Sequence, residues 1–270
     1  MALAETAYAK INLALHVRGR REDGYHEIET LFAFVDRGDR LTAHSAASDT
    51  LHVVGEFADQ LADRFGNIVG KALSALPRRE GLAVTLEKNL PVAAGLGGGS
   101  GDAGAVFRLV REAQGLPDDW VARAARLGAD VPACVESVTC IGRGTGTEIE
   151  PVDSDLTGTP VLLVNPRVPL ATAAVFGAWD GIDRGPLPEG PLSVVIEQGR
   201  NDLAGPAISL CPLVLDVLRA LRETDADLVR MSGSGATCFA TYRSHDVMHK
   251  AMESLALRYP QWWQMSGSLR

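Results

Sequence analysis

A glycine-rich stretch over residues 91–104 constrains the fold and chemistry of this chain more than any other part of the sequence. It reads Pro-Val-Ala-Ala-Gly-Leu-Gly-Gly-Gly-Ser-Gly-Asp-Ala-Gly and follows an alternating run, residues 82–88, that predicts a strand. The apolar residues of 105–113 recur at helical spacing. Glycine lets a ligand approach the backbone closely, and a helix start presents unpaired N–H groups. The stretch therefore predicts an anion site suited to a chain of phosphates.

Three other interpretations of this stretch have to be weighed. A P-loop NTPase needs a Gly-Lys-Ser/Thr ending, which the sequence does not contain. The dinucleotide pattern Gly-x-Gly-x-x-Gly matches residues 99–104, but it belongs to an early βαβ unit, and the region before this loop is rich in strands. A flexible linker is disfavoured by the apolar residues and the helix that flank the glycines.

The composition is that of an ordinary globular chain. Its 270 residues suffice for one large domain or two modest ones. A formal net charge of -8 argues against nucleic acid as a partner, because phosphate backbones require a basic face. The four cysteines lack metal-site or redox-pair spacing, which predicts reduced thiols in a cytoplasmic protein. Without a signal peptide or a long apolar run, we expect no membrane association.

Strands and helices mix without strict βαβ alternation, which favours an α+β fold with mostly antiparallel sheets. The first 55 residues are rich in strands, and the first amphipathic helix spans residues 67–76. Residues 157–160, Thr-Gly-Thr-Pro, mark a boundary between two expected domains, 1–157 and 158–270.

Two charged residues in constrained settings are candidates for chemistry. Lys10 is the strongly charged residue of an alternating first strand, a pattern that also fits a lysine protecting a strand edge. Asp130 lies between Gly128 and Pro132 and fits the cap of a short helix. A cap position also fixes the direction of a carboxylate, so the two interpretations of Asp130 are compatible.

The order of motifs along the chain resembles the GHMP kinases, the superfamily of galactokinase, homoserine kinase and mevalonate kinase. The glycine stretch matches Pro-x-x-x-Gly-Leu-Gly-Gly-Gly-Ser-x-Asp-Ala, and the other matching motifs are residues 7–13, 21–32, 127–132, 201–203 and 231–236. The full set resembles the branch that phosphorylates the 2-hydroxyl of 4-diphosphocytidyl-2-C-methyl-D-erythritol in the non-mevalonate route to isoprenoid precursors.

This resemblance implies a two-domain kinase with an active-site cleft between its domains, acting on a small cytidine diphosphate-alcohol as a monomer or weak homodimer. It implies ATP as phosphoryl donor, with Mg²⁺ carried mainly by the nucleotide. Alternatives are a GHMP kinase of the homoserine or mevalonate type, or a nucleotide-binding protein without catalysis. The presence of both Lys10 and Asp130 argues against the last of these.

The resemblance also implies roles for individual residues. Asp130 would accept the hydroxyl proton, and Lys10 would keep Asp130 ionised and offset charge in the transition state. The residues expected to bind ATP are Pro91, Val92, Ala93, Ala94, Gly95, Leu96, Gly97, Gly98, Gly99, Ser100 and Gly101, with Asn67 and Lys88 near the adenine. The residues expected to bind substrate are Tyr25 and Phe176, stacked on cytosine, His26, which reads the base, and Asn12 and Thr172, at the diphosphate or erythritol. Judged by residue type alone, Tyr25 and Phe176 could equally well be residues of a hydrophobic core.

The sequence departs from the family pattern within the glycine stretch. Gly101 stands where a second serine is usual, and Gly104 stands where alanine is usual. The loop would therefore lack one hydroxyl contact to phosphate.

Overall fold

The structure, a computed structural model, describes residues 3–61 and 67–270 and divides into two compact units. Unit 1 comprises Met1–Lys10, Arg37–Val92 and Gly97–Ser137, and unit 2 comprises Ile11–Asp36, Ala93–Leu96 and Val138–Arg270. The chain passes from one unit to the other several times, and residue 157 lies within unit 2. The sequence boundary at that position stays a prediction.

Two long strands, β1 (Leu3–Arg20) and β2 (His26–Ala46), pair with each other and contribute to both units. The other elements of unit 1 are β3 (Thr50–Val54), the 3-10 helix η1 (Ala58–Gln60), α1 (Ile68–Ala75), β4 (Gly81–Glu87), α2 (Gly98–Gln114), α3 (Trp120–Leu127) and α4 (Val131–Glu136). Strand β4 pairs antiparallel with β2 and parallel with β3.

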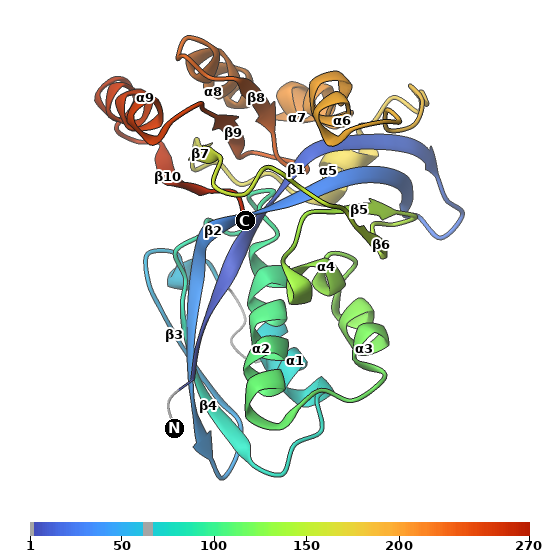
Figure 1. Cartoon of the computed structure of the whole chain (residues 1–270), viewed down its shortest axis with the longest axis vertical. Coiled ribbons are helices and arrows are strands. Elements are labelled where there is room, and N and C mark those ends of the chain that lie inside the picture. The colour runs from blue at the N-terminus through green and yellow to red at the C-terminus, as the bar shows by residue number, and fades with distance from the viewer. Residues whose placement is uncertain (1–2, 62–66) are drawn as a thin grey trace. The chain divides into compact units, whose positions relative to one another are not determined.

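The core of unit 1 lies between these strands and one layer of helices (Figure 1). Alternation along β4 buries Leu82, Val84 and Leu86, which belong to the same apolar cluster as residues of α1 and α2. Burying those side chains stabilises the unit by about 1.5–3 kcal/mol each. The helix layer is thereby fixed against the strand that leads into the glycine stretch.

Unit 2 contains a four-stranded antiparallel sheet in the order β10-β7-β9-β8. Its elements are β5 (Cys140–Arg143), β6 (Glu148–Pro151), β7 (Pro160–Asn165), α5 (Thr172–Gly177), α6 (Leu192–Gln198), α7 (Ala204–Leu210), α8 (Leu213–Arg222), β8 (Leu228–Met231), β9 (Cys238–Thr241), α9 (His245–Arg258) and β10 (Trp263–Ser268). Strand β7 is buried along its whole length, and β5 forms a hairpin with β6. The predicted α+β fold with mostly antiparallel sheets is confirmed.

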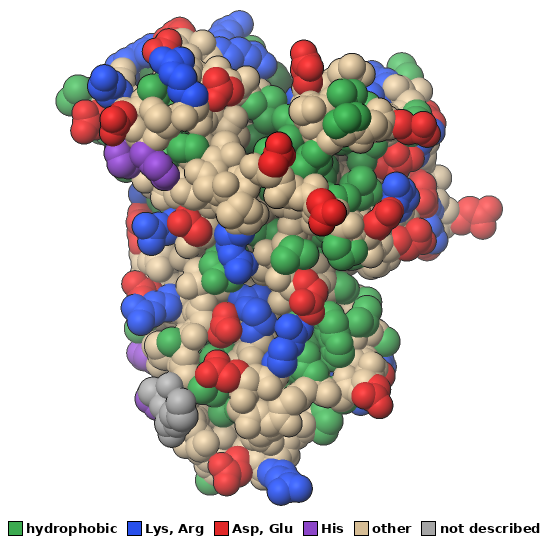
Figure 2. Space-filling view, in the orientation of Figure 1, with side chains coloured by type: hydrophobic (Ala, Val, Ile, Leu, Met, Phe, Trp, Pro, Cys, Tyr) green, Lys and Arg blue, Asp and Glu red, His purple; other side chains and the backbone are tan. Residues whose placement is uncertain are grey.

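The surface carries both signs of charge. On the face shown in Figure 2, Lys and Arg side chains are interspersed with Asp and Glu. Within the described residues, no helix is at once long enough and apolar enough to cross a bilayer. All four cysteines are buried, and they form no disulfide among the described residues.

His16 of β1 is a buried titratable side chain that holds a glycine- and proline-rich loop of unit 2. Its Nε2 accepts the N–H of Arg200 at 3.2 Å, so the neutral ring carries its proton on Nδ1. Nδ1 donates to the carbonyl oxygen of Pro186 at 2.9 Å. Burial, followed by the positive charge of Arg200, lowers the pKa of His16, and the charge of Asp202 opposes this shift.

We expect this histidine to make stability fall on acidification. Because the folded-state pKa lies below the usual value of 6.5, the neutral ring stabilises the fold above that pH. The contribution is lost as pH falls below 6.5 toward the folded pKa, where protonation removes the Nε2 acceptor. Urea denaturation at several pH values should show a smaller loss of unfolding free energy between about pH 7 and 5 in His16→Gln than in the wild type. Identical pH dependence in both proteins would contradict the assignment.

Candidate active site

Unit 1 brings together the two residues predicted to carry out catalysis. The Nζ atom of Lys10 lies 2.9 Å from Oδ2 of Asp130. The lysine side chain is 5% exposed and the aspartate side chain is 29% exposed, so one side of the carboxylate remains open to an approaching group. Lys10 therefore supplies a fixed positive charge beside an accessible proton acceptor.

The local backbone explains the direction of Asp130. It is the residue before α4, and its carbonyl accepts the N–H of Cys134 at 3.0 Å. Its side chain makes no capping hydrogen bond. Asp130 therefore occupies the predicted N-cap position. Its carboxylate, however, faces Lys10 and not the helix amides.

The glycine stretch forms the start of α2 beside Lys10. The helix begins at Gly98, within the glycines, and its N-cap Gly97 has φ of 62°. A Cβ at Gly97 would lie 3.0 Å from Cε of Lys10, so the lysine would have to shift by a few tenths of an ångström, and the left-handed φ itself favours glycine. The first N–H groups of α2 have no intrahelical acceptor. A helix start with unpaired N–H groups therefore lies beside the Lys10–Asp130 pair.

Ser100 lies close to the segment that leads to Asp130. Its Oγ would be 3.9 Å from a Cβ built at Gly128. Lys10, Asp130, Gly97 and Ser100 therefore share one region of unit 1.

The two departures from the family pattern face packing neighbours. A Cβ at Gly101 would lie 3.2 Å from the carbonyl oxygen of Tyr8, and one at Gly104 would lie 2.4 Å from the carbonyl oxygen of Cys134. Separations under 3.0 Å require the backbone to move. Gly104 therefore permits α2 to lie directly against α4, and Gly101 permits close packing on β1.

Lys88, which is expected near the adenine, makes its polar contacts within the protein. Its side chain is buried, with Nζ bonded to carboxylates of Asp39 and, at 2.8 Å, Asp102. Its backbone N–H donates to Val54, and its carbonyl accepts from Phe57. Both the side chain and the backbone polar groups of Lys88 are therefore engaged within the protein.

This Asp39–Lys88–Asp102 triad packs against the start of α2, where Asp102 is one of the helix residues. A Cβ at Gly98 would lie 3.2 Å from Nζ of Lys88. Burial raises the pKa of Asp102 to about 8; the charge of Lys88 opposes this shift, and that of Asp39 adds to it. Burial disfavours the charged form of Lys88, but the carboxylates outweigh it and raise the pKa of Lys88. The ammonium thus stays charged at the start of α2.

Asn67 serves as the N-cap of α1. Its Oδ1 accepts the N–H of Val69 at 2.8 Å. This contact is structural and uses one of the two polar groups of the amide. An adenine contact of Asn67 stays a prediction.

The residues predicted to bind cytosine lie in unit 2. The ring centroids of His26 and Phe176 are 5.0 Å apart, and those of His26 and Trp179 are 5.7 Å apart in an edge-on arrangement. Tyr25 is 63% exposed. Burial, followed by the charge of Arg20, lowers the pKa of His26. These residues offer aromatic faces beside a neutral imidazole.

Two polar atoms in this aromatic group have no hydrogen-bond partner among the described residues. They are Nε2 of His26 and Nε1 of Trp179, and both are buried. A buried polar atom without a partner costs free energy, so these two atoms distinguish the aromatic group from an ordinary core. Sequence reasoning missed Trp179; its position three residues after Phe176 on a helical segment was the available signal.

Asn12 and Thr172 both meet the second glycine turn, residues 232–235. The N–H of Asn12 donates to Oγ of Ser232 at 3.3 Å, and Oγ1 of Thr172 lies 3.0 Å from Oγ of Ser234. Nδ2 of Asn201 donates to the carbonyls of Met231 and Gly233, at 2.8 Å each. The asparagine of the 201–203 motif thus holds the turn.

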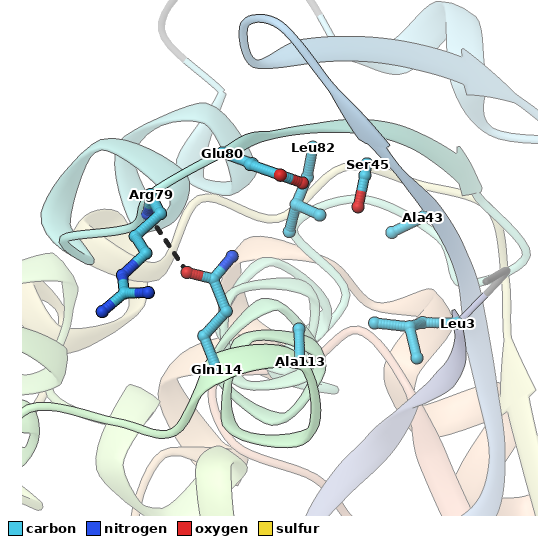
Figure 3. Close-up of a pocket in the computed structure, with 8 residues that line it drawn as sticks. All are labelled: Leu3, Ala43, Ser45, Arg79, Glu80, Leu82, Ala113 and Gln114. Carbon is cyan, nitrogen blue, oxygen red and sulfur yellow. Dashed lines mark hydrogen bonds between the residues drawn. The ribbon is translucent and has the colours of Figure 1, made fainter.

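A pocket of about 480 Å³ is present elsewhere in unit 1. Figure 3 shows its walls, which come from β1, β2, β4, the segment before β4 and the end of α2. Gln114 accepts the backbone N–H of Arg79 at its rim. None of the residues predicted to bind ATP or substrate lines this pocket. No group of three or more His, Cys, Asp or Glu side chains able to hold a metal occurs among the residues described.

Two family models match the chain: the GHMP kinases N terminal domain over residues 54–137 and the GHMP kinases C terminal over residues 196–261. A 4-diphosphocytidyl-2-C-methyl-D-erythritol kinase of Novosphingobium aromaticivorans is 65% identical over 270 residues, covering all of this chain and 94% of that protein. One from Erythrobacter litoralis is 60% identical, covering 99% of this chain and all of that protein.

The structural comparisons agree with the sequence comparisons. A crystal structure of 4-(cytidine 5'-diphospho)-2C-methyl-D-erythritol kinase matches with a TM-score of 0.82 at 33% identity, covering 99% of both chains. A homoserine kinase from Cytophaga hutchinsonii matches with a TM-score of 0.69 at 15% identity, covering 99% of this chain and 95% of that one. The second match shows a shared fold alone.

Proposed function

The chain belongs to the GHMP kinases, and we propose that it phosphorylates the 2-hydroxyl of 4-diphosphocytidyl-2-C-methyl-D-erythritol with ATP. The relatives at 65% and 60% identity support this substrate over that of a homoserine or mevalonate kinase. The observation that carries the catalytic proposal is the 2.9 Å pair of Lys10 and Asp130 beside the glycine-rich start of α2.

In this proposal Asp130 acts as the general base. Phosphoryl transfer leaves little covalent chemistry to side chains, so positioning and charge stabilisation dominate. The exposed part of the carboxylate accepts the hydroxyl proton as the alcohol oxygen attacks phosphorus. Lys10 places a positive charge beside the carboxylate, where negative charge develops in the transition state.

The start of α2 fits a chain of phosphates. Its unbonded N–H groups and helix dipole favour an anion, and Gly97 leaves room for close approach to the backbone. ATP supplies the transferred phosphoryl group, and Mg²⁺ offsets the phosphate charge when bound. The backbone of residues 91–101 would orient the phosphates, and Ser100 would add its hydroxyl to a phosphate or to the metal. With no protein carboxylate cluster among the described residues, we propose that the nucleotide carries most of the metal's ligands.

The aromatic group of unit 2 fits a pyrimidine. Tyr25 and Phe176 would stack on its two faces, and Nε2 of His26, which lacks a partner among the described residues, would bond to its edge. Asn12 and Thr172, at the second glycine turn, would hold the diphosphate or erythritol part. The proposal requires the residues at the base and the residues at the diphosphate or erythritol to bind the same substrate molecule.

We also propose a cytoplasmic location, supported by four buried cysteines without a disulfide among the described residues. Assembly as a monomer or weak homodimer stays a prediction. Measuring ADP release with 4-diphosphocytidyl-2-C-methyl-D-erythritol, homoserine or mevalonate as acceptor tests the function. Turnover confined to the cytidine substrate is expected; turnover with another acceptor, or with none of the three, would overturn the proposal.

Removing the Phe176 ring should weaken binding of the cytidine substrate selectively. Base–aromatic stacking contributes about 1–3 kcal/mol, so Phe176→Ala should raise KM for that substrate by about 5- to 150-fold. KM for ATP should stay within about twofold of the wild type on the same reasoning. Steady-state kinetics with each substrate varied in turn provides the measurement. Phe176→Tyr, which keeps a stacking face, is the control, and equal increases in both KM values would indicate a packing role instead.

A further inference from the structure

We infer that Arg108 positions the Lys10–Asp130 pair by joining the strand that carries the lysine to the helix that follows the aspartate. Arg108 lies on α2, the helix that begins with the glycine stretch. The inference deepens the proposed function and rests on it, because the pair that Arg108 would position is the proposed catalytic pair.

One part of the guanidinium binds β1 upstream of Lys10. Nε donates to the Glu5 carboxylate at 2.9 Å, and Nη2 donates to the carbonyl of Thr6 at 2.6 Å. The guanidinium carbon also lies 5.3 Å from the ring centroid of Tyr8. These contacts fix the backbone of β1 within a few residues of Lys10.

The remaining nitrogen, Nη1, binds the end of α4. It donates to the carbonyls of Cys134 at 2.7 Å and Val135 at 3.2 Å, and contacts Oγ of Ser137 at 3.2 Å. Those carbonyls belong to the last turn of a helix, where acceptors lack intrahelical donors and favour a positive charge. Arg108 therefore secures the opposite end of α4 from Asp130.

The shortness of α4 makes this attachment relevant to Asp130. The helix spans six residues, which corresponds to a length of about 9 Å. Gly104, one turn before Arg108, lets α2 contact the same carbonyl of Cys134 directly. A shift at the Cys134 end is therefore transmitted through little more than one turn to the carboxylate.

A planar guanidinium suits this position better than an ammonium. Its donors point in fixed directions, so one side chain can serve strand and helix at once. The side chain is 13% exposed, which limits competition from water. A lysine could keep the charge beside Glu5 but could not reproduce the fork.

The test compares Arg108→Ala with Arg111→Ala. Arg111 lies on the same helix and also bonds to the α4 region, through Glu136 at 2.6 Å, but within the described residues it makes no hydrogen bond or ion pair with β1. Because a misplacement of about 1 Å can reduce rate about 100-fold, Arg108→Ala should lower kcat by about 10- to 100-fold. KM for ATP should change by less than about threefold, and Arg111→Ala should keep kcat within about twofold.

Chemical rescue separates positioning from general loss of structure. Guanidinium chloride at millimolar concentration, far below denaturing levels, should restore part of the kcat of Arg108→Ala and leave Arg111→Ala unchanged. Arg108→Lys should remain impaired by at least about tenfold, because it lacks the planar fork. A kcat within threefold of the wild type in Arg108→Ala, or a loss that guanidinium does not reverse in a folded variant, would overturn the inference.

If Arg108→Ala does not fold, Arg108→Lys decides the matter by the same kcat criterion. A loss of at least tenfold supports positioning, and a smaller loss overturns it. Failure of the proposed function would appear earlier, as absence of turnover in the wild-type protein with 4-diphosphocytidyl-2-C-methyl-D-erythritol.

Discussion

Asp130→Asn is expected to lower kcat by about 10³-fold while ATP and substrate still bind, because the amide keeps the shape of the carboxylate but cannot accept the hydroxyl proton. The Lys10–Asp130 distance of 2.9 Å places this change directly beside a fixed ammonium, which the asparagine leaves unneutralised. Single-turnover phosphorylation measures the chemical step. Thermal shift with an ATP analogue and with the cytidine substrate measures binding, because ligands of the folded state raise apparent stability.

Asp119→Asn is the matched control for this experiment. Asp119 is also the residue before a helix, α3, makes no side-chain cap, and is paired with an arginine, Arg123, at 2.7 Å. Its substitution should leave kcat within about twofold of the wild type, since it is exposed and lies outside the proposed site. Near-normal kcat in Asp130→Asn, with both ligands bound, would remove Asp130 as the base.

Lys88→Met is expected to reduce the free energy of unfolding by about 3–5 kcal/mol, because it leaves two buried acidic groups without their cation. The side chains of Lys88, Asp39 and Asp102 are 2%, 0% and 3% exposed, so water cannot replace the lost ammonium. Urea denaturation with linear extrapolation measures the effect. A variant that loses this much stability can unfold during expression at 37 °C. It should therefore be expressed at low temperature.

Two further variants make the Lys88 experiment specific. Lys71→Met, on an exposed position of α1, should change the unfolding free energy by less than about 0.5 kcal/mol. Asp39→Asn/Lys88→Met/Asp102→Asn should recover part of the stability by removing the unpaired acidic groups along with the lysine. A loss below about 1 kcal/mol in Lys88→Met would show that the triad contributes little.

Local patterns predicted many of the elements that surround the candidate site. The alternation in residues 82–88 and the helical spacing of residues 67–76 correspond to β4 and α1. The start of α2 was harder to predict, because glycine has a low intrinsic helix propensity. In the structure α2 nevertheless begins at Gly98. Its first turns pack against α4 at Gly104 and are bonded to Lys88 through Asp102.

The Lys10–Asp130 pair could be anticipated only through family resemblance. Lys10 and Asp130 are far apart in the sequence, and neither has a local signal that identifies its partner. Lys88 shows another limit: its place near the adenine is expected from the matching position alone, and the sequence does not show its burial against Asp39 and Asp102. Arg108 has an ordinary sequence context, and only its contacts distinguish it.

The direct contact of α2 with α4 at Gly104 has a consequence for exchanging segments between related kinases. A loop transplanted from a relative that carries alanine at this position would bring a methyl carbon to within 2.4 Å of the Cys134 carbonyl of the recipient. Such a chimaera should require residues 128–137 from the same donor. The glycine stretch and the aspartate-bearing segment of this chain therefore constitute one unit of packing, and they should be exchanged together.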